Sequence, residues 1–432
     1  MTKPDGNGTT PHRRIVLLLP TATYRAGAFM EAAARLGIDV VVATEHAPPL
    51  ATEMEDRLVD VDFDRPEESA SRIAAFADRT PLDAVIGVDD QGVLTAAHAG
   101  ELLGLAHNPP DAVAATRDKI EMRSVLDAWS VPQPAFRVVT PGSDVATLAV
   151  QVGLPCVIKP TSPSASTGVI RADTPEQAVV VAERVRDILV RHGRRADEPL
   201  LVEKFVGGAE VALEGVLRDG ELRVLAVFDK PDPLVGPYFE ETIYLTPSRL
   251  SSAERDAVIA VTTAGCRALG LREGPVHAEL RVGGPHAGVD GGVRVLEIAA
   301  RTIGGLCSRV LRFGAGVSLE ELVLRHALGF DTSDLVRDGD AAGVMMLPIP
   351  RSGVLIGVGG VDDALAVDGV AGLEITATTG RRIDALPEGG RYLGFVFARG
   401  ESPERVERSL RTAHSLLAID IDDDPKRGGS TT

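Results

Sequence analysis

The segment VLEIAARTIGG (295–305) places two charged side chains in a stretch that otherwise has the pattern of a buried strand. Successive side chains of a strand alternate between its faces, so Glu297 and Arg301 share one face while Leu296 and Ile298 point to the other. A carboxylate and a guanidinium rarely enter such a run without partners. One economical explanation is a divalent metal held by Glu297 beside a phosphate held by Arg301.

A second acidic residue lies upstream in the apolar segment PVHAELRV (275–282), where His277 and Glu279 share a face. The connector GGPHAGVDGG (283–292) is rich in turn residues, so the region predicts an antiparallel hairpin that brings Glu279 beside Glu297. Adjacent carboxylates resist joint ionisation unless a cation lies between them, and Mg²⁺ takes one or two carboxylates together with phosphate oxygens. A pair of surface strand acids bridged by an arginine is an equally acceptable interpretation of these segments alone.

The composition excludes several classes of protein. No run approaches the roughly 18–20 apolar residues of a membrane helix, and the polar start of the chain lacks the apolar core of a signal peptide, so we expect a cytoplasmic protein without membrane contact. A net charge of −17 provides no electrostatic footprint for nucleic acid. The three scattered cysteines are expected in the core, and the nine histidines form no metal-ligand spacing.

Strands alternate with helices in the N-terminal part of the chain. Strands are expected at 13–20, 38–44 and 83–90, with helices near 26–36 and 92–105. This order favours a parallel, Rossmann-like α/β sheet. No G-x-G-x-x-G fingerprint follows a strand here, so nothing indicates a dinucleotide.

The remaining chain divides into α+β units. From about residue 340, strands followed by a serine-capped helix at 402–418 are typical of a small α+β module. We therefore expect an α/β and α+β multidomain protein. Its expected parts are disordered tails at 1–12 and 421–432, a Rossmann-like domain at 13–112, two α+β units at 113–198 and 199–335, and a C-terminal module at 336–420.

Two lysines stand where an anion would stabilise them. Lys159 lies in the apolar strand CVIKP, and burial of an ammonium group favours an anion nearby or a lowered pKa. The loop 161–168 that follows can offer hydroxyl and backbone donors to phosphates. Lys119 falls in the first turn of a helix capped by Asp118, where the helix dipole disfavours a cation. An ordinary exposed lysine and a solvated loop remain open as alternatives.

The segment LLVEKFVGGAE (200–210) reads as a strand that ends in two glycines. It has the features of a hinge whose backbone contacts a flat base. Glu203 and Glu210 are candidates for contacts with the amino group and the ribose hydroxyls of a nucleotide. An ordinary edge strand and turn explain the segment equally well.

Taken together and in this order, these elements resemble the ATP-grasp superfamily. The residues that carry the resemblance are Lys119, Lys159 with SPSASTGV (162–169), EKFV (203–206), Glu279 and EIAAR (297–301). More narrowly, DKIEMRSVL, CVIKP, GPVHAEL and EIAARTIGGL are similar to carboxylate–amine ligases, notably the bacterial L-amino-acid ligases. The resemblance implies an ATP-grasp central domain with two α+β subdomains, a lysine subdomain at 113–198 and a metal-binding subdomain at 199–335.

The resemblance also implies roles for particular residues. The implied ATP-binding set is Lys119, Lys159, Ser164, Ser166, Thr167, Gly168, Glu203, Lys204, Phe205, Val206 and Glu210. The implied metal ligands are Glu279 and Glu297. The implied substrate-binding set is His277, Arg301, Gly304 and Gly305, with Arg301 also stabilising the transferring phosphate. For His277, a purely structural hydrogen-bonding role is an equal alternative.

The implied activity is ATP-dependent ligation. ATP would phosphorylate a small carboxylic acid or amino acid, an amine or amino acid would attack the acyl phosphate, and an amide or peptide bond would form with release of ADP and phosphate. The implied cofactors are ATP and one or two Mg²⁺ ions, with Mn²⁺ as a substitute, and a homodimer is the default assembly. An ATP-grasp carboxylase or ligase of primary metabolism is a second possibility. A catalytically weak ATP-binding protein is a third, because Ala299 stands where the family has a metal-ligating asparagine.

Overall fold

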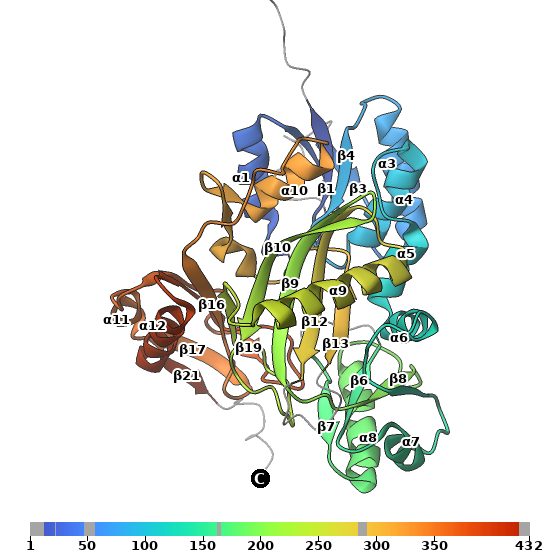
Figure 1. Cartoon of the computed structure of the whole chain (residues 1–432), viewed down its shortest axis with the longest axis vertical. Coiled ribbons are helices and arrows are strands. Elements are labelled where there is room, and N and C mark those ends of the chain that lie inside the picture. Colours follow the sequence, from blue (N-terminus) through green and yellow to red (C-terminus); the bar gives the residue numbers. More distant parts are fainter. Residues whose placement is uncertain (1–12, 22, 47–56, 162–165, 284–291, 423–432) are drawn as a thin grey trace, which may run out of the picture.

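The computed structural model describes residues 13–21, 23–46, 57–161, 166–283 and 292–422 (Figure 1). Residues 1–12 and most of the expected C-terminal tail lie outside this part of the chain. No helix within the described residues is both long and apolar enough to cross a membrane.

The N-terminal region forms the parallel sheet that its alternating pattern predicts. Its strands are ordered β3-β2-β1-β4, and every pair is parallel. The strands are β1 (Arg14–Leu18), β2 (Asp39–Thr44), β3 (Leu58–Asp60) and β4 (Ala84–Gly87), and the helices are α1 (Ala26–Leu36), α3 (Pro66–Ala77) and α4 (Val93–Leu103). Apolar side chains on both faces of β1 are buried, as a sheet covered by helices on two sides requires.

A second unit follows through two consecutive helices, α5 (Pro110–Arg117) and α6 (Lys119–Ala128). Asp118 caps α6 by accepting hydrogen bonds from the backbone N–H groups of Ile120 and Glu121, as its position in the sequence predicts. An antiparallel sheet of order β5-β8-β6-β7 then packs against two helices. The strands are β5 (Phe136–Val139), β6 (Cys156–Pro160), β7 (Ile170–Ala172) and β8 (Leu200–Lys204), and the helices are α7 (Val145–Val152) and α8 (Pro175–Arg191).

The largest sheet has eight strands in the order β13-β12-β9-β10-β11-β16-β20-β18. Its strands are β9 (Ala209–Arg218), β10 (Glu221–Lys230), β11 (Ile243–Thr246), β12 (Gly274–Val282), β13 (Val293–Ala299), β16 (Ala341–Leu347), β18 (Val370–Ile375) and β20 (Gly394–Gly400). Helix α9 (Ser252–Leu269) packs on this sheet, where Gly265 leaves room for Ile298 because a Cβ there would lie 2.4 Å from the Ile298 side chain. Antiparallel pairing of β11 with β16 carries the sheet past residue 336, so the two expected C-terminal units share one sheet.

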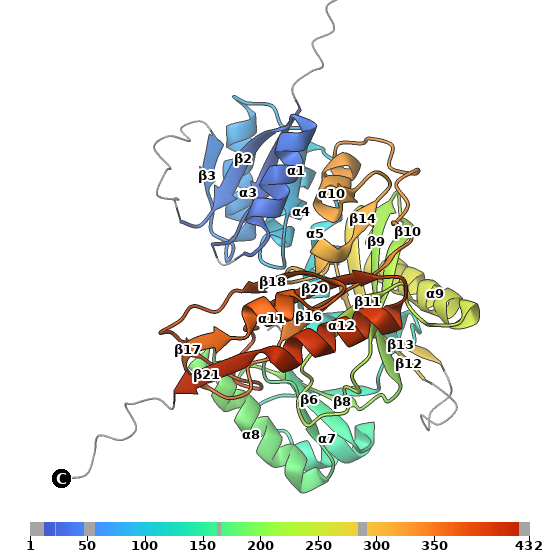
Figure 2. The ribbon, with the colours of Figure 1, turned by 90° about the vertical axis from the view of Figure 1, so that its left-hand side faces the viewer.

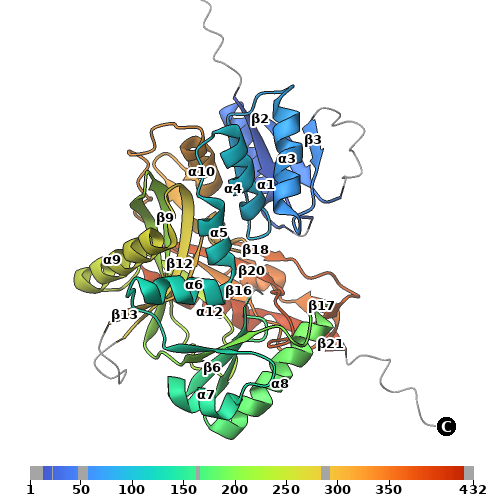
Figure 3. The same cartoon turned by 90° about the vertical axis from the view of Figure 1, so that its right-hand side faces the viewer.

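The remaining elements complete the C-terminal part. They are η2 (Cys307–Val310), β14 (Arg312–Phe313), β15 (Val317–Ser318), α10 (Leu319–Ala327), β17 (Gly353–Gly359), α11 (Val361–Leu365), β19 (Arg382–Ile383), α12 (Pro403–Leu416) and β21 (Ala418–Asp422). Figure 2 shows α1 and β6 at opposite ends of the molecule with the strands β16, β20 and β18 between them. In Figure 3, α5 runs from the N-terminal sheet toward α6 and the second unit. The multidomain α/β and α+β architecture expected from the sequence is thus confirmed.

Candidate active site

A cavity of about 530 Å³ lies where these units meet. Every unit contributes to its wall, including residues that are more than three hundred positions apart in the sequence. It is lined by the predicted residues Lys119, Lys159, Ser166, Glu203, Lys204, Phe205, Val206, Glu210, His277, Glu279, Glu297, Arg301, Gly304 and Gly305. The fold therefore gathers most of the residues that the sequence singled out into one site.

The acidic hairpin forms as predicted. Strands β12 and β13 are antiparallel, and Glu279 and Glu297 are directly opposed partners in their register. Directly opposed residues project from the same face of a sheet. Strand β13 ends at Ala299, so Arg301 does not continue the strand as expected but lies in the bend that follows it. Its side chain nevertheless lines the same cavity.

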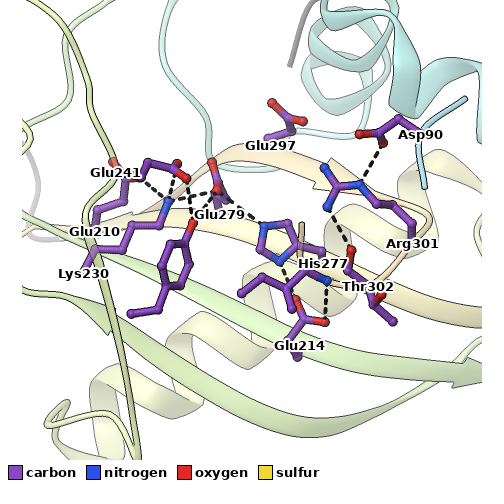
Figure 4. A network of polar contacts seen from close by, with 12 residues as sticks. Asp90, Glu210, Glu214, Lys230, Glu241, His277, Glu279, Glu297, Arg301 and Thr302 are labelled. Atoms are coloured by element: carbon purple, nitrogen blue, oxygen red, sulfur yellow. Dashed lines mark hydrogen bonds and ion pairs between the residues drawn. The ribbon is translucent and has the colours of Figure 1, made fainter. Parts of the chain in front are cut away.

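Arg301 is held by the N-terminal domain. Its Nε lies 2.9 Å from Oδ1 of Asp90, which follows β4, and its Nη1 donates to the backbone carbonyl of Thr302 at 3.0 Å (Figure 4). Burial disfavours the guanidinium charge, but Asp90 outweighs this effect and raises the pKa of Arg301. Arg301 is therefore a fixed cation on the cavity wall at any ordinary pH.

The two predicted phosphate-binding lysines have carboxylate partners. The Nζ of Lys119, in the first turn of α6, lies 3.3 Å from Oε2 of Glu297. The Nζ of Lys159, on β6, lies 2.8 Å from Oε2 of Glu203. Burial lowers the pKa of Lys159 to about 8, and the neighbouring Glu203 carboxylate limits that fall.

The side chain of Glu203 contacts two cations. It is buried between Lys159 and Arg123, whose Nε donates to Glu203 Oε1 at 2.6 Å. Burial would raise the pKa of Glu203, but these two cations bring it down to about 2. Both of its oxygens already hold cations, and a contact between this carboxylate and the amino group of a base stays a prediction. Its side chain positions Lys159.

An ionic cluster not foreseen from the sequence surrounds Lys230 at the end of β10. The Nζ of Lys230 lies 2.8 Å from Glu210, 2.7 Å from Glu241 and 2.9 Å from Glu279 (Figure 4). Burial alone would raise the pKa of Glu279. The charge of Lys230 stabilises the ionised carboxylate and brings this pKa well below its usual value. Burial and repulsion from Glu279 raise the pKa of Glu241 to about 7. The sequence signal that could have found this cluster is a lysine that closes an apolar strand.

Glu210 also contacts a second cation, Arg281. Its Oε2 lies 2.9 Å from Nε of Arg281 on β12. Glu210 therefore sits between two buried cations on the cavity wall. A contact between Glu210 and the ribose of a nucleotide stays a prediction.

His277 is buried beside two carboxylates. Its Nδ1 bonds to Oε1 of Glu214 on β9, and its Nε2 lies 3.4 Å from Oε1 of Glu279. Burial alone would lower the pKa of His277, but Glu214 raises it to about 9. Since an imidazolium ion cannot accept a proton, this environment favours a substrate contact or a structural role over deprotonation of an amine.

The predicted phosphate loop is described only from residue 166 onward, and Ser164 lies outside the described residues. Ser166 lines the cavity with a φ of 55°, the left-handed conformation. The backbone N–H of Gly168 donates to the carbonyl of Pro387 at 3.0 Å, and the hydroxyl of Thr167 donates to the carbonyl of Gly389 at 3.3 Å. The loop thus rests on the C-terminal module.

The hinge joins β8 to β9 on the cavity wall. The N–H groups of Lys204 and Phe205 donate to the carbonyls of Ala135 and Pro155 at 2.8 and 2.9 Å. The Phe205 ring carries the Arg171 guanidinium at 4.7 Å from its centroid. Phe205 and Val206 both line the cavity, and their apolar surface suits a planar base.

Gly304 and Gly305 line the cavity, and the space around Gly304 is open. A Cβ at Gly304 would meet no heavy atom within 4 Å, whereas one at Gly305, whose φ is +60°, would lie 3.0 Å from the ring of Phe395. Cys307 is buried beside them, and burial raises its thiol pKa, so it is no ready nucleophile. The expectation that all the cysteines are core residues is confirmed.

Three family models match the chain. They are the ATP-grasp N-terminal domain at residues 30–107, the ATP-grasp domain at 152–310 and the L-amino acid ligase C-terminal domain 2 at 345–422. The three matches follow one another along the chain in the order of the domains described above.

Two individual proteins are also similar to this chain in sequence. A protein of Sinorhizobium fredii named uncharacterized protein y4rH is 27% identical over 363 residues, which cover 80% of this chain and 73% of that protein. An alanine–anticapsin ligase of Bacillus amyloliquefaciens is 27% identical over 238 residues, so the match spans only 51% of this chain and 50% of that protein.

A solved structure shares the fold over almost the whole chain. The crystal structure of an L-amino acid ligase from Bacillus licheniformis superimposes with a TM-score of 0.77 at 24% identity, and the match covers 95% of this chain and 99% of that one. The solved structure shows that the fold is shared. The matched models show that this chain belongs to the ATP-grasp superfamily and that its C-terminal part is similar to the L-amino acid ligase C-terminal domain 2.

Proposed function

We propose that this protein is an ATP-dependent carboxylate–amine ligase, which forms an amide or peptide bond through an acyl phosphate. The observation that carries the proposal is the pairing of Glu279 with Glu297 on one wall of a cavity that also presents Lys119, Lys159 and Arg301. The cavity thus presents carboxylates and cations together, which suits a metal-bound triphosphate.

The donor set fits Mg²⁺. Carboxylate oxygens are its preferred protein ligands, and Glu279 and Glu297 occupy directly opposed positions on the cavity wall. Glu279 and its partner Glu297 are the residues that would hold the ion, and Mn²⁺ would suit the same ligands. When bound, the metal neutralises charge on the transferring phosphate. Lys230 shows that this acidic wall already stabilises a cation.

The protein's part in the first step is positioning and charge neutralisation. Lys119 and Lys159 would bind the phosphates of ATP, and Arg301 would bind the oxygens of the transferring γ-phosphate with its two-pronged guanidinium. The substrate carboxylate attacks this phosphorus atom, ADP leaves, and a mixed anhydride of the acid and phosphate results. The open surface at Gly304 would let the acyl group approach the backbone closely.

In the second step the amine attacks the acyl carbon. The C–O bond to phosphate breaks, phosphate leaves with the bonding electrons, and the amine loses a proton to the phosphate or to water. No protein nucleophile is required, which agrees with the buried environment of Cys307 on the wall of the cavity. A small carboxylic acid or amino acid and an amine or amino acid are therefore the proposed substrates.

A substrate screen tests this proposal. Purified protein with ATP and Mg²⁺ is given pairs of amino acids and small carboxylic acids, and phosphate release and product mass are measured. Hydroxylamine serves as a universal amine, because it converts an acyl phosphate into a hydroxamate that identifies the acid. We expect phosphate release that depends on both substrates, and its absence across the panel would contradict ligase activity.

Two arginine variants assign the chemistry. Arg301→Ala should lower the rate by about 10³-fold while leaving ADP binding within a few-fold, because the guanidinium acts mainly on the transferring group. Arg309→Ala is the control, since Arg309 is exposed and pairs with Glu374. A near-normal rate for Arg301→Ala would remove the proposed role.

A catalytically weak ATP-binding protein is the second candidate. The methyl group of Ala299 ends β13 and supplies no oxygen to a metal. Under this alternative the protein binds ATP with Mg²⁺, but ADP release does not respond to any amine. Calorimetry with a non-hydrolysable ATP analogue, together with the screen above, separates the two candidates.

A further inference from the structure

A second cavity, of about 580 Å³, lies outside the active site. It is lined by residues of η2, β14, β18 and β20, and the last two strands run side by side (Figure 2). Among the described residues, its lining and that of the active-site cavity have no member in common. Because a volume of several hundred cubic ångströms is typical of small-molecule sites, this cavity is a candidate ligand site of its own.

Basic side chains dominate the charge of this second cavity. Arg309, Arg312 and Arg399 line it, and Glu374 is the acidic residue among its described lining. Three arginines less one glutamate leave two positive charges on the lining, although the chain as a whole has a net charge of −17. A concave surface lined mainly by one sign of charge attracts ions of the opposite sign. This arginine cavity therefore favours an anion.

Two of the three arginines lack a paired carboxylate within the described part of the chain. Arg309 forms an ion pair with Glu374. In contrast, Nη1 of Arg312 donates to the preceding backbone carbonyl at 2.7 Å, and Nη2 of Arg399 donates to the carbonyl of Val310 at 3.2 Å. These two contacts are with neutral groups, so the charges of Arg312 and Arg399 are not compensated by a direct partner among the described residues.

Like charges meet around Arg399. Burial lowers the pKa of Arg312, and the charge of Arg399 lowers it further. Glu320 and Asp338 offset part of this effect. Burial also lowers the pKa of Arg337, and Arg399 again acts in the same direction. Holding such cations together is unfavourable, and a bound anion would relieve their repulsion.

The arginine cavity also offers apolar surface beside these charges. Val310, Leu373 and Phe397 line it. Phe397 lies two positions before Arg399 on β20, so the two side chains share a face of the strand. An organic group would pack on this surface while an anionic group reaches the arginines. Two uncompensated guanidinium groups match a dianion, and a phosphate monoester carries close to two negative charges near neutral pH, whereas a carboxylate carries one.

We propose that the arginine cavity binds a phosphate-bearing small molecule, whose phosphate group contacts Arg312 and Arg399 and whose organic part packs on Phe397. A planar guanidinium group donates two parallel hydrogen bonds to phosphate oxygens, so two such groups hold a phosphate in a defined orientation. Because the described lining of this cavity is separate from that of the active site, its ligand is not a reactant of the proposed ligation. The assignment does not rest on the ligase function.

Two probes of similar shape and different charge test this site. Phenyl phosphate is mostly a dianion near neutral pH, whereas phenyl sulfate is a monoanion. Calorimetry measures the binding of each probe with saturating ADP and Mg²⁺ present, so that the phosphate positions of the active site are filled. We expect wild type to bind phenyl phosphate at least about tenfold more tightly than phenyl sulfate.

Variants at the two uncompensated arginines assign the binding to this cavity. Arg399→Gln and Arg312→Gln each remove a charge and retain a side-chain donor, so each should weaken the binding of phenyl phosphate by about tenfold or more. Arg399→Lys keeps the charge and should retain most of the preference for phenyl phosphate. Arg405→Gln, which breaks an exposed pair with Asp368 and lies outside the described lining, is the control and should bind like wild type.

Several results would overturn the proposal. They are an absence of phenyl phosphate binding, an equal affinity for the two probes, or full binding in both glutamine variants. Binding that vanishes in Arg301→Ala but persists in Arg399→Gln would assign the probe to the active-site cavity and also overturn it. Equal loss of the preference in Arg399→Lys and Arg399→Gln would indicate a structural role for this arginine and would count against the site in the same way.

Discussion

Glu279 and Glu297 lie directly opposite each other on β12 and β13, and each contacts its own lysine. The Nζ of Lys230 is 2.9 Å from Glu279, and the Nζ of Lys119 is 3.3 Å from Glu297. Two carboxylates held this way repel less than an uncompensated pair would. The lysines therefore stabilise, in the protein alone, an acidic pair that suits a divalent ion.

Replacement of Lys230 by methionine should destabilise the protein. It would leave Glu210, Glu241 and Glu279 facing one another without the buried cation they share. We expect the free energy of unfolding to fall by about 3–5 kcal/mol, the usual effect of removing one partner from a buried ion pair. Thermal unfolding with and without Mg²⁺ measures this, and Mg²⁺ should restore part of the loss. Arg72→Met, at an exposed pair with Asp60, is the control, and an equal change in both variants would contradict the prediction.

Nucleotide binding should take up a proton near pH 8. The buried ammonium of Lys159 has a pKa of about 8, and a polyphosphate nearby would raise it. Affinity for ADP should therefore decrease as the pH rises through 8, because the neutral amine must first be protonated. Calorimetry in buffers of different ionisation enthalpy measures the uptake. Lys159→Arg should abolish it, since a guanidinium stays charged, and uptake that persists in this variant would assign the proton to another group.

The ion pair between Asp90 and Arg301 should support catalysis by holding Arg301 in place. This ion pair ties the bend after β13 to the N-terminal domain. Asp90→Asn keeps the shape of the side chain but removes the charge, so we expect kcat to fall by about 10–100-fold through misplacement of Arg301, with little change in ADP binding. Asp83→Asn, which removes the charge of a half-buried carboxylate that pairs with Arg13, is the matched control in the same domain. A full kcat in Asp90→Asn would show that Arg301 needs no such support.

His326 should make the protein sensitive to mild acid. Its Nε2 donates to the carbonyl of Leu217 at 2.9 Å, and burial lowers its pKa to about 4 from an ordinary value of 6.5. The folded state thus favours the neutral ring, so this contribution to stability is complete above pH 6.5 and is lost as the pH falls toward 4. We expect a loss of about 1–3 kcal/mol over that range. Denaturation of His326→Gln should show a correspondingly weaker pH dependence, and His98→Gln should behave like the parent protein.

The two hinge glycines should respond differently to alanine. Gly208 has a φ of +97°, and a Cβ there would lie 2.2 Å from the carbonyl oxygen of Val282, whereas one at Gly207 would meet nothing within 4 Å. We expect Gly208→Ala to destabilise the protein by about 2 kcal/mol or more and to weaken nucleotide binding. Gly207→Ala should be nearly neutral. Chemical denaturation of both variants decides this, and equal stabilities would refute the packing argument.

Local pattern was enough to identify many elements. The periodicity of residues 26–36 predicted the bounds of α1, and the position of Asp118 predicted the cap of α6. The pairing of Glu279 with Glu297 was also predicted, because a turn-rich connector between two strands favours a hairpin. Glu279, Glu297 and Lys159 were therefore recognisable as site residues.

The local sequence pattern did not predict contacts between residues that are distant in sequence. Glu203 accepts a hydrogen bond from Arg123, which stands eighty positions away, and the local sequence shows no sign of this contact. Lys230 ends β10 and contacts acids from three other segments, and no sequence pattern predicted these contacts. No spacing rule links such residues, since their contact depends on how strands are ordered in the sheet.

The sequence by itself therefore determined the elements, the acidic hairpin and the superfamily, since these rest on periodicity, turn chemistry and ordered motifs that act over short stretches of chain. Only the tertiary structure decided which charge each buried group faces. Arg301 received Asp90 from the N-terminal domain, and Glu203 received Arg123 and Lys159. The physical reason is that the energy of a buried charge depends on the groups packed around it, and packing joins segments that the sequence keeps hundreds of residues apart.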